Sequence, residues 1–269
     1  CSCRSVCLVP KHTPHTSHTP HPVSNSVFNS EHLLFTPVSP DPDAIPTIFA
    51  FPNEYTVGIT SLGYQVVWAT LAMRSDLEVS RLFTDVHESL PRSPELVGFS
   101  LSWELDYVNI LNLLEFLEVP IRSAVRGNNN PLIFGGGPVL SANPEPFADF
   151  FDVILVGDGE DLLGNFINAY QEVRTADRVT KLHRLAQVPG IYIPSLYQVE
   201  YQGDSIASIN PIASNIPETI TKQTYRGNTL SVSSVVTEKA AWESIFMVEV
   251  VRSCPEMCRF CLASYLTLP

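Results

Sequence analysis

The chain reads Leu132-Ile133-Phe134-Gly135-Gly136-Gly137-Pro138 near its middle and Val153-Ile154-Leu155-Val156-Gly157-Asp158-Gly159-Glu160 a short way further on. Each stretch is a short apolar run that ends abruptly in glycine. Such a run predicts a strand that is buried on both faces, and the glycines predict a tight turn into a following helix. Repetition of this unit is typical of a parallel sheet covered by helices.

The same alternation extends outward from these two stretches. Strands are also predicted at 47–51, 79–84 and 96–102, which with 132–134 and 153–156 makes five. Helices are predicted at 64–73, at 104–118 and up to about residue 170, with Thr60 or Ser61 as the cap of the first. We therefore expect an α/β domain over residues 45–175, built on a doubly wound, Rossmann-like parallel sheet.

Small and polar residues gather where the predicted strands end. They are Asn53, Ser100, Ser102, Gly135, Gly136, Gly137, Gly157, Asp158, Gly159 and Glu160. Because the carboxyl ends of parallel strands meet at one edge of a sheet, we expect a ligand crevice there. Glycine lets backbone amides approach a phosphate, a nucleotide or a corrin edge, and the start of a helix adds partial positive charge. Ordinary turns between strand and helix also need glycine, so this alternative stays open.

Acidic residues outnumber basic ones by 28 to 16, which gives the chain a net charge of −12 and a pI near 4.9. Binding along a nucleic-acid backbone needs a basic face, so nucleic acid is an unexpected partner. No apolar run approaches the ~18 residues that span a bilayer, and no segment resembles a signal peptide. Because no cysteine lies between Cys7 and Cys254, a disulfide framework is also not expected, and we predict a cytoplasmic protein.

The first 44 residues differ in composition from the rest. They begin with Cys rather than Met, which suggests that the natural start lies elsewhere, and they are rich in Pro, Ser, Thr and His. Such a segment cannot bury enough apolar surface to fold, so residues 1–44 are predicted to be disordered. A polyproline II helix would align His12, His15, His18 and His21 for metal binding, whereas a low-complexity tail would carry them by chance. Cys1, Cys3 and Cys7 allow the same two interpretations.

Residues 176–240 are predicted to connect this domain to a second one. A helix is expected near Thr180–Ala186, then a hairpin of Gly190–Ile193 with Tyr197–Tyr201, then a polar connector over 203–230. The apolar run Phe246–Val251 predicts a strand that leads directly into a cysteine-rich loop. Barrel enzymes carry their site residues at the carboxyl ends of strands, so 241–269 is predicted to be the first strand and site loop of a truncated barrel.

That loop reads Cys254-Pro255-Glu256-Met257-Cys258-Arg259-Phe260-Cys261. Three thiolates without a fourth ligand suit an iron-sulfur cluster that leaves one iron open. A structural zinc site needs four protein ligands, and no His or Cys lies within fifty residues upstream of Cys254. Zinc with a fourth ligand from beyond Pro269, or three ordinary loop cysteines, are the alternatives.

The spacing C-x3-C-x-aromatic-C after an apolar run resembles the radical SAM superfamily. The resemblance implies an enzyme in which Cys254, Cys258 and Cys261 hold a 4Fe-4S cluster whose open iron binds S-adenosylmethionine and releases a 5'-deoxyadenosyl radical. It implies that Phe260 contacts the adenine region, and it places Arg259 and Arg252 where they could offset the charge of the cluster. It also implies an electron donor such as flavodoxin or ferredoxin.

The upstream domain resembles the branch of this superfamily with a cobalamin-binding-like N-terminal domain, and residues 49–55, 135–138 and 156–160 resemble uncharacterised members. The cobalamin motif Asp-x-His-x-x-Gly is expected after the first strand, whereas Asp85-Val86-His87 follows the second and lacks the glycine. His87 is therefore interpreted as a surface residue. The resemblance leaves cobalamin an open question, because some members of this branch bind the cobalt without a protein imidazole. Residues 45–253 contain no cysteine, which argues against the second cluster of the tRNA methylthiotransferases.

The sequence thus predicts the N-terminal portion of a radical SAM enzyme, inactive by itself because only one barrel strand is present. The alternative is a non-catalytic α/β module that binds cobalamin, a nucleotide or a partner protein and carries a relic or zinc-binding loop. No motif indicates the substrate, the reaction or the oligomeric state.

Overall fold

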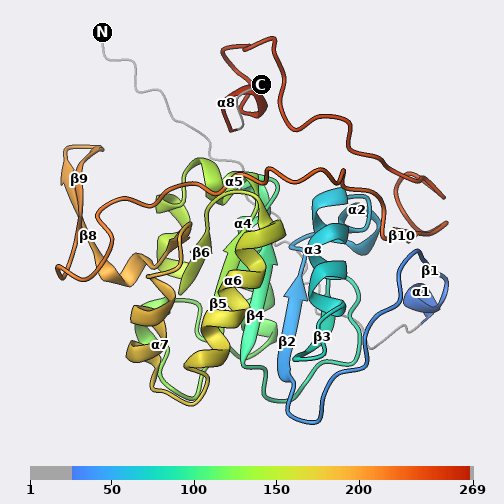
Figure 1. The fold of residues 1–269 in the computed structure, drawn as a ribbon, viewed down its shortest axis with the longest axis horizontal. Coiled ribbons are helices and arrows are strands. Elements are labelled where there is room, and N and C mark those ends of the chain that lie inside the picture. Colours follow the sequence, from blue (N-terminus) through green and yellow to red (C-terminus); the bar gives the residue numbers. More distant parts are fainter. Residues whose placement is uncertain (1–25, 267–269) are drawn as a thin grey trace, which may run out of the picture.

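The computed structural model describes residues 26–266, and a six-stranded sheet lies at its centre (Figure 1). Its strands are β2 (Ile45–Ala50), β3 (Leu77–Leu82), β4 (Leu96–Ser100), β5 (Leu132–Gly136), β6 (Val153–Leu155) and β7 (Ile191–Tyr192). Their spatial order is β3-β2-β4-β5-β6-β7; the first five strands are parallel, and β7 pairs with β6 in the antiparallel direction. The predicted α/β class with a mostly parallel sheet is therefore confirmed.

The order of the strands reverses once within the parallel part of the sheet. From β2 the chain moves to β3 on one side and then returns to β4 on the other side of β2. In doubly wound sheets the loops leave in opposite directions at such a point, and a crevice opens beyond the carboxyl ends of the two strands. A ligand site is therefore expected beyond the ends of β2 and β4.

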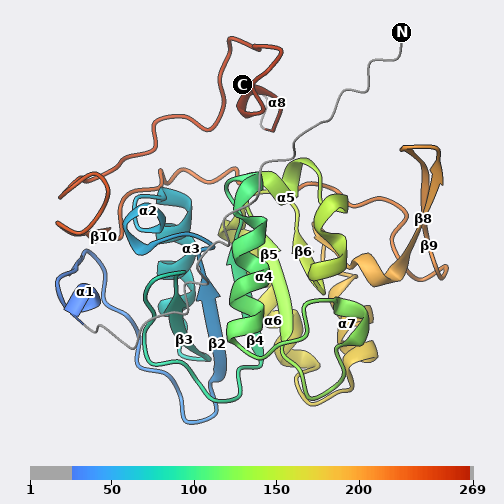
Figure 2. The same cartoon turned by 180° about the vertical axis from the view of Figure 1, so that it is seen from behind.

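Helices cover both faces of the sheet. One face carries α3 (Leu62–Ala72), α6 (Gly159–Glu172) and α7 (Arg178–Leu185), and the other carries α4 (Tyr107–Phe116) and α5 (Pro138–Ala142), as Figures 1 and 2 show from opposite sides. Each face has its own apolar core, with Tyr64 and Phe166 buried in the first and Leu114 and Phe151 in the second. Fully burying one such side chain contributes about 1.5–3 kcal/mol, so the two cores dominate the stability of the fold.

Local signals explain why the main helices begin where they do. The hydroxyl of Ser61 accepts a hydrogen bond from the Tyr64 amide and so caps α3, as the sequence predicted. In α4, Ile110, Leu113 and Leu114 recur at the spacing that places apolar side chains on one face, and all three are buried. The short helix α2 (Tyr55–Gly58) precedes α3.

The segment before the sheet is folded wherever the structure describes it. Helix α1 (Ser26–Asn29) and strand β1 (His32–Leu33) lie beside the β3 edge, and Phe28, Leu33 and Phe35 pack against the first core. The prediction that 1–44 is disordered is thus wrong for 26–44. These residues contribute their own aromatic and aliphatic side chains to the core, which outweighs the effect of their polar composition.

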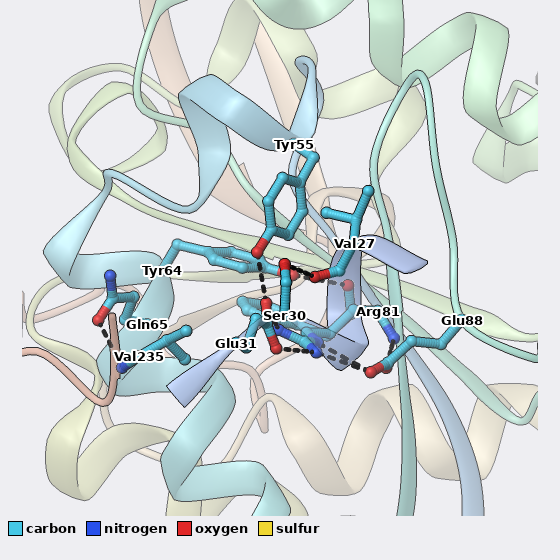
Figure 3. Close-up of polar contacts among 10 residues, drawn as sticks. Val27, Ser30, Glu31, Tyr55, Tyr64, Gln65, Arg81, Glu88 and Val235 are labelled. Carbon is cyan, nitrogen blue, oxygen red and sulfur yellow. Dashed lines mark hydrogen bonds and ion pairs between the residues drawn. The ribbon is translucent and has the colours of Figure 1, made fainter. Parts of the chain in front are cut away.

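A buried ion pair fastens this segment to the sheet (Figure 3). The Arg81 guanidinium, on β3, donates to both carboxylate oxygens of Glu31 at 2.8 and 2.7 Å and also to Glu88. The hydroxyl of Tyr55 donates to the same Glu31 carboxylate at 2.7 Å. The guanidinium also lies over the Trp68 ring, 4.0 Å from its centroid. These contacts join the turn between α1 and β1 to β3 and α2, which holds α1 and β1 in place.

The region after α7 corrects several predictions. Gly190–Ile193 does not form a hairpin with Tyr197–Tyr201; β7 completes the main sheet, which extends the domain past residue 175. Strand β8 (Tyr197–Gln202) pairs instead with β9 (Ser205–Pro211), within the segment predicted to be a connector. Strand β10 (Val235–Val236) pairs with β1. The predicted helix near Thr180–Ala186 is confirmed as α7.

The C-terminal segment crosses above the carboxyl end of the sheet (Figure 1). Phe246–Val251, predicted to be a strand, makes a single bridge, Val232 with Val248, and Val250 and Val251 are exposed. A barrel strand needs hydrogen-bonded neighbours on both sides, and within the described chain this run finds only residues 231–233. The short helix α8 (Ala263–Leu266) follows. Among residues 26–266, no helix has both the length and the apolar character needed to cross a bilayer.

Candidate functional site

A cavity of about 310 Å³ opens at the carboxyl ends of the parallel strands, between the first turns of α3 and α6. Its floor is formed by apolar side chains of the sheet, among them Phe49, Phe134 and Leu155. Val67 of α3 and Leu163 of α6 line its two helical walls. The cavity thus lies where a doubly wound sheet places its ligand crevice.

The predicted crevice glycines lie in and beside this cavity. Gly136, Gly137, Gly157 and Gly159 line it, whereas Gly135 does not. A Cβ atom on Gly135 would lie 2.4 Å from the Phe151 ring, so this position needs glycine for core packing. A Cβ atom on Gly136 would meet only ordinary contacts, the nearest at 3.7 Å. Of the five predicted crevice glycines, Gly135 is therefore needed for core packing, and the other four line the cavity.

Glycine is required at position 157 because the backbone of Gln223 lies directly beside it, after the end of β6. Gly157 has φ +120°, and a Cβ atom there would lie 2.0 Å from the carbonyl oxygen of Gln223. The amide of Gly157 donates to the Ser141 hydroxyl, and the amide of Asp158 donates to the Gln223 carbonyl. These two amides are therefore committed to the protein itself, although the sequence suggested them as donors to a phosphate.

A single cation lies at the rim of the cavity among three carboxylates. The Arg252 guanidinium lies 2.7 Å from Glu249 and 3.3 Å from Asp158, and it also donates to Glu160. Hydrogen bonds to Glu249 and then to Glu160 raise the pKa of Arg252 above its ordinary value, although partial burial opposes them. Donation by Arg252 also lowers the pKa of Glu249. Arg252, interpreted from the sequence as a residue near the cluster, therefore ties the C-terminal segment to α6.

The three cysteines follow Arg252 closely on one partly exposed loop. Cys254, Cys258 and Cys261 are all free thiols of intermediate exposure. Phe260 is 92% exposed, and Arg259 is exposed as well. Met257 adopts φ +48°, and its carbonyl accepts a hydrogen bond from the Tyr265 hydroxyl. The structure thus places the predicted ligands on one turn-rich loop beside the cavity rim.

The described residues do not hold these thiols in a ready-made ligand group. Across residues 26–266, no set of three or more His, Cys, Asp or Glu side chains is arranged to bind a metal ion. The donor set nevertheless fits an iron-sulfur cluster, because all three ligands are free cysteines within eight residues and share one loop. The histidines and cysteines near the N-terminus, Cys1 to His21, lie outside the described residues.

Cobalamin does not fit the loop that follows the first strand of the sheet. That loop reads Asn53-Glu54-Tyr55-Thr56-Val57-Gly58, so a tyrosine stands where the cobalamin motif has histidine. Tyr55 is 1% exposed and its hydroxyl is bound to Glu31, so it faces away from the crevice. His87 is partly buried, with Nδ1 beside its neighbour's carbonyl oxygen, and it does not line the cavity.

Sequence reasoning missed the contacts that connect the parts of this site. Asp158 and Glu160 lie in the predicted crevice, but their ion pairs with Arg252 could not be predicted because Arg252 comes from a distant segment. Glu249, three residues before Arg252, was not singled out. Asp106 was missed as well. Its Oδ1 accepts from the Asn53 side chain, while its buried Oδ2 has no hydrogen-bond partner, and burial raises its pKa. Asn53, predicted to lie at the crevice, does not line the cavity.

Comparison with known proteins places most of the sheet in a described family. Residues 66–194 match the family described as radical SAM proteins, N-terminal. This match runs from within α3 through β7 and includes most of the cavity wall, but it ends before the cysteine loop. An uncharacterized protein of Methanocaldococcus jannaschii is 27% identical over 221 residues, which cover 81% of this chain and 41% of that protein. The chain therefore spans less than half the length of that relative, and no solved structure gives a significant match.

Proposed function

We propose that Cys254, Cys258 and Cys261 hold a 4Fe-4S cluster, since residues 66–194 match the family described as radical SAM proteins, N-terminal. The proposal assigns the protein to the radical SAM enzymes, with S-adenosylmethionine as the second cofactor. It leaves the substrate undefined. The chain would contribute the cluster loop and the domain that precedes it.

The observation that carries this proposal is the loop of three free cysteines anchored beside the cavity rim. A cluster held by three thiolates keeps one iron available for another ligand, and when bound it supplies one-electron reduction of S-adenosylmethionine. The thiols lie on a loop rather than on a helix or strand, so the loop can adjust as they bind metal. The exposure of Phe260 leaves its ring free to contact a bound ligand.

Arg252 has a defined task under this proposal. It holds the residues just before Cys254 against Asp158 and Glu160 of the α/β domain. An ion pair that is partly shielded from solvent and shared among three carboxylates is harder to break than an isolated surface pair. Arg252 would therefore position the cluster loop over the carboxyl edge of the sheet. Its charge is already neutralised by protein carboxylates, so it would act through position rather than by balancing the cluster's charge.

Reconstitution with iron and sulfide under anaerobic conditions tests the cluster. The full chain should take up about four iron and four sulfide, with brown absorption and an electron paramagnetic resonance signal after reduction by dithionite or by flavodoxin. The triple variant Cys254→Ala, Cys258→Ala, Cys261→Ala should take up none. The matched control is Cys1→Ala, Cys3→Ala, Cys7→Ala, which removes the other three cysteines and should leave the signal unchanged.

The same experiment separates the alternatives. Zinc would give one colourless metal ion per chain, bound in competition with iron, and a relic loop would bind neither metal. A chromophore that persists in the Cys254, Cys258 and Cys261 triple variant would overturn the assignment. Cobalamin binding by the α/β domain is not proposed, because Tyr55 takes the place of the lower-ligand histidine and is buried.

A further inference from the structure

We propose that the cavity between α3 and α6 is a binding site for a small, largely apolar molecule that is neutral or positively charged. This site is distinct from the cysteine loop, and it does not depend on the presence of a cluster. The ligand would lie on the sheet floor with its polar or cationic end toward the rim formed by Asp158, Glu160 and Glu249.

The first argument is the shape of the cavity and its place in the fold. Its volume of about 310 Å³ is at the lower end of the range of small-molecule sites. Ser100, at the end of β4, and Gly136, at the end of β5, both line it. Close-packed protein interiors rarely leave voids of this size, and a void at the carboxyl ends of parallel strands is the usual place for a ligand.

The second argument is the apolar character of the walls. The floor includes the side chains of Phe49, Phe134 and Leu155, and Val66 with Val67 forms the α3 wall. Uncompensated burial of a charged group against such a surface is costly. The inner end of the ligand is therefore expected to be a hydrocarbon or aromatic group.

The third argument is the charge of the rim. Among the lining residues the charged side chains are Asp158, Glu160, Glu249 and Arg252, which leave an excess of two negative charges. The positive end of α6 is met by Glu160 and Asp161 in its first turn. The amides of Gly157 and Asp158 are committed to Ser141 and Gln223. An anion such as a phosphate would thus meet net negative charge and lose two of the backbone donors that it would need.

The fourth argument is that the rim belongs to the segment that carries the cysteines. Ser231, Glu249 and Arg252 all line the cavity, and Cys254 lies two residues after Arg252. A ligand in the cavity would therefore touch the same side chains that hold the cysteine loop in place. The cavity is built from both the α/β domain and this segment.

Three one-ring probes of similar size test the proposal on the full chain: benzyl alcohol, benzylamine and benzoate. Binding is measured by ligand-observed saturation-transfer NMR at pH 7 with the apo chain. Benzyl alcohol and protonated benzylamine should bind with dissociation constants on the order of 1 mM, a reasonable value for such small ligands. Benzoate should bind roughly tenfold more weakly than benzylamine, because the rim repels a carboxylate.

Two variants place the binding in the cavity. Gly136→Val adds a side chain at a lining position with room for a Cβ atom, and Val66→Phe fills the cavity from the opposite wall. Either variant should reduce the affinity for benzyl alcohol at least tenfold, and Val66→Phe decides the matter if Gly136→Val does not fold. The matched control, Gly164→Val, adds the same side chain where no atom lies within 4 Å and outside the lining, and should bind normally.

Three results would overturn the proposal. They are binding of none of the probes, equal or tighter binding of benzoate, and full retention of binding in both filled variants. Since no iron or S-adenosylmethionine is present, these results leave the cluster proposal unaffected.

Discussion

Arg81 and Glu31 form a two-pronged ion pair whose side chains are only 3% and 2% exposed. The pair joins the segment before the sheet to β3, and Glu88 and Tyr55 complete its hydrogen bonds. The energy of such a pair depends on whether both partners remain, because a single charge left in the interior is far more costly than a matched pair.

Replacing Glu31 with Gln should destabilise the chain by about 3–5 kcal/mol, because Arg81 then loses its buried counter-charge and keeps only the partly exposed Glu88. Urea unfolding followed by circular dichroism gives the free energy. The matched control is Arg122→Gln, which breaks an ion pair with Asp149 whose side chains are both 68% exposed, and it should change stability by less than about 1 kcal/mol. Equal effects of the two substitutions would contradict the structural role of the buried pair.

Gly137→Ala should be strongly destabilising. Gly137 has φ +111°, and a Cβ atom there would lie 2.5 Å from the Leu101 carbonyl oxygen. The backbone strain alone costs about 1–3 kcal/mol, and the contact with the backbone adds to it. Thermal unfolding measures the loss. Gly127→Ala, where nothing lies within 4 Å of the added atom, serves as the control and should change stability by less than about 1 kcal/mol.

Gln65→Met should remove the hydrogen bonds that hold β10 and the residue before it against α3. The Gln65 side chain is buried, accepts from the amides of Ser234 and Val235, and donates to the Ile59 carbonyl, and methionine keeps its shape without these bonds. The cost should be about 1–3 kcal/mol. Hydrogen exchange at Ser234 and Val235 should accelerate, whereas Gln187→Met, at an exposed glutamine, should leave it unchanged. Unchanged protection of both amides in Gln65→Met would contradict this role of the Gln65 side chain.

The contact between Arg252 and Glu249 should weaken in acid. Donation by Arg252 lowers the pKa of Glu249 from its ordinary value near 4.5. Because the folded-state pKa is the lower one, the stabilisation is complete above pH 4.5 and is lost as the pH falls through the folded-state pKa. Protection factors of the Ser233 and Glu249 amides, which bond to Met247 and Ser231, should fall over this range.

Glu249→Gln provides the control for that measurement. It removes the titrating group, so the protection of the two amides should be lower at neutral pH and should not change with acidification. The Phe134 amide in the central sheet should keep its protection in both proteins. A fall of equal size in the wild type and in Glu249→Gln would assign the acid effect to another group.

The parallel sheet could be predicted because its signals are local. Leu96–Ser100 and Leu132–Gly136 are short apolar runs that end in small residues, and both became buried strands. The spacing of Ile110, Leu113 and Leu114 likewise determines a helix face without reference to the rest of the chain. Elements of this kind are specified by a few neighbouring residues.

Most of the errors concern contacts between distant residues, whereas the missed hairpin of β8 with β9 is local. Gly190–Ile193 was predicted to pair with Tyr197–Tyr201 in a hairpin, but Ile191–Tyr192 pairs with β6 from an earlier part of the chain. The polar composition of 26–44 concealed Glu31, whose partner Arg81 is fifty residues away. In Phe246–Val251 the apolar pattern was present, but a strand also needs a partner along its length, and the pattern carries no information on that partner.

The candidate site likewise combines features that the sequence could predict with features that it could not. The cysteine spacing and the glycines at the strand ends could be read directly from the sequence. The sequence could not show that Gly135 leaves room for the Phe151 ring or that Gly157 leaves room for the Gln223 backbone. Those neighbours come from other segments of the chain. The net charge of the cavity rim likewise appears only when Arg252 and the carboxylates are placed together.

The pairing of β1 with β10 has a consequence for the order of folding. Leu33 is opposite Val235, so the pair closes a loop of about two hundred residues that contains the entire sheet. Contacts between residues so far apart in sequence cost much entropy until the intervening chain is compact, so they form late on average. The parallel sheet should therefore assemble first, and the two flanking segments should dock afterwards as a single closing step. In a stopped-flow refolding experiment, protection of β4 should precede that of Val235.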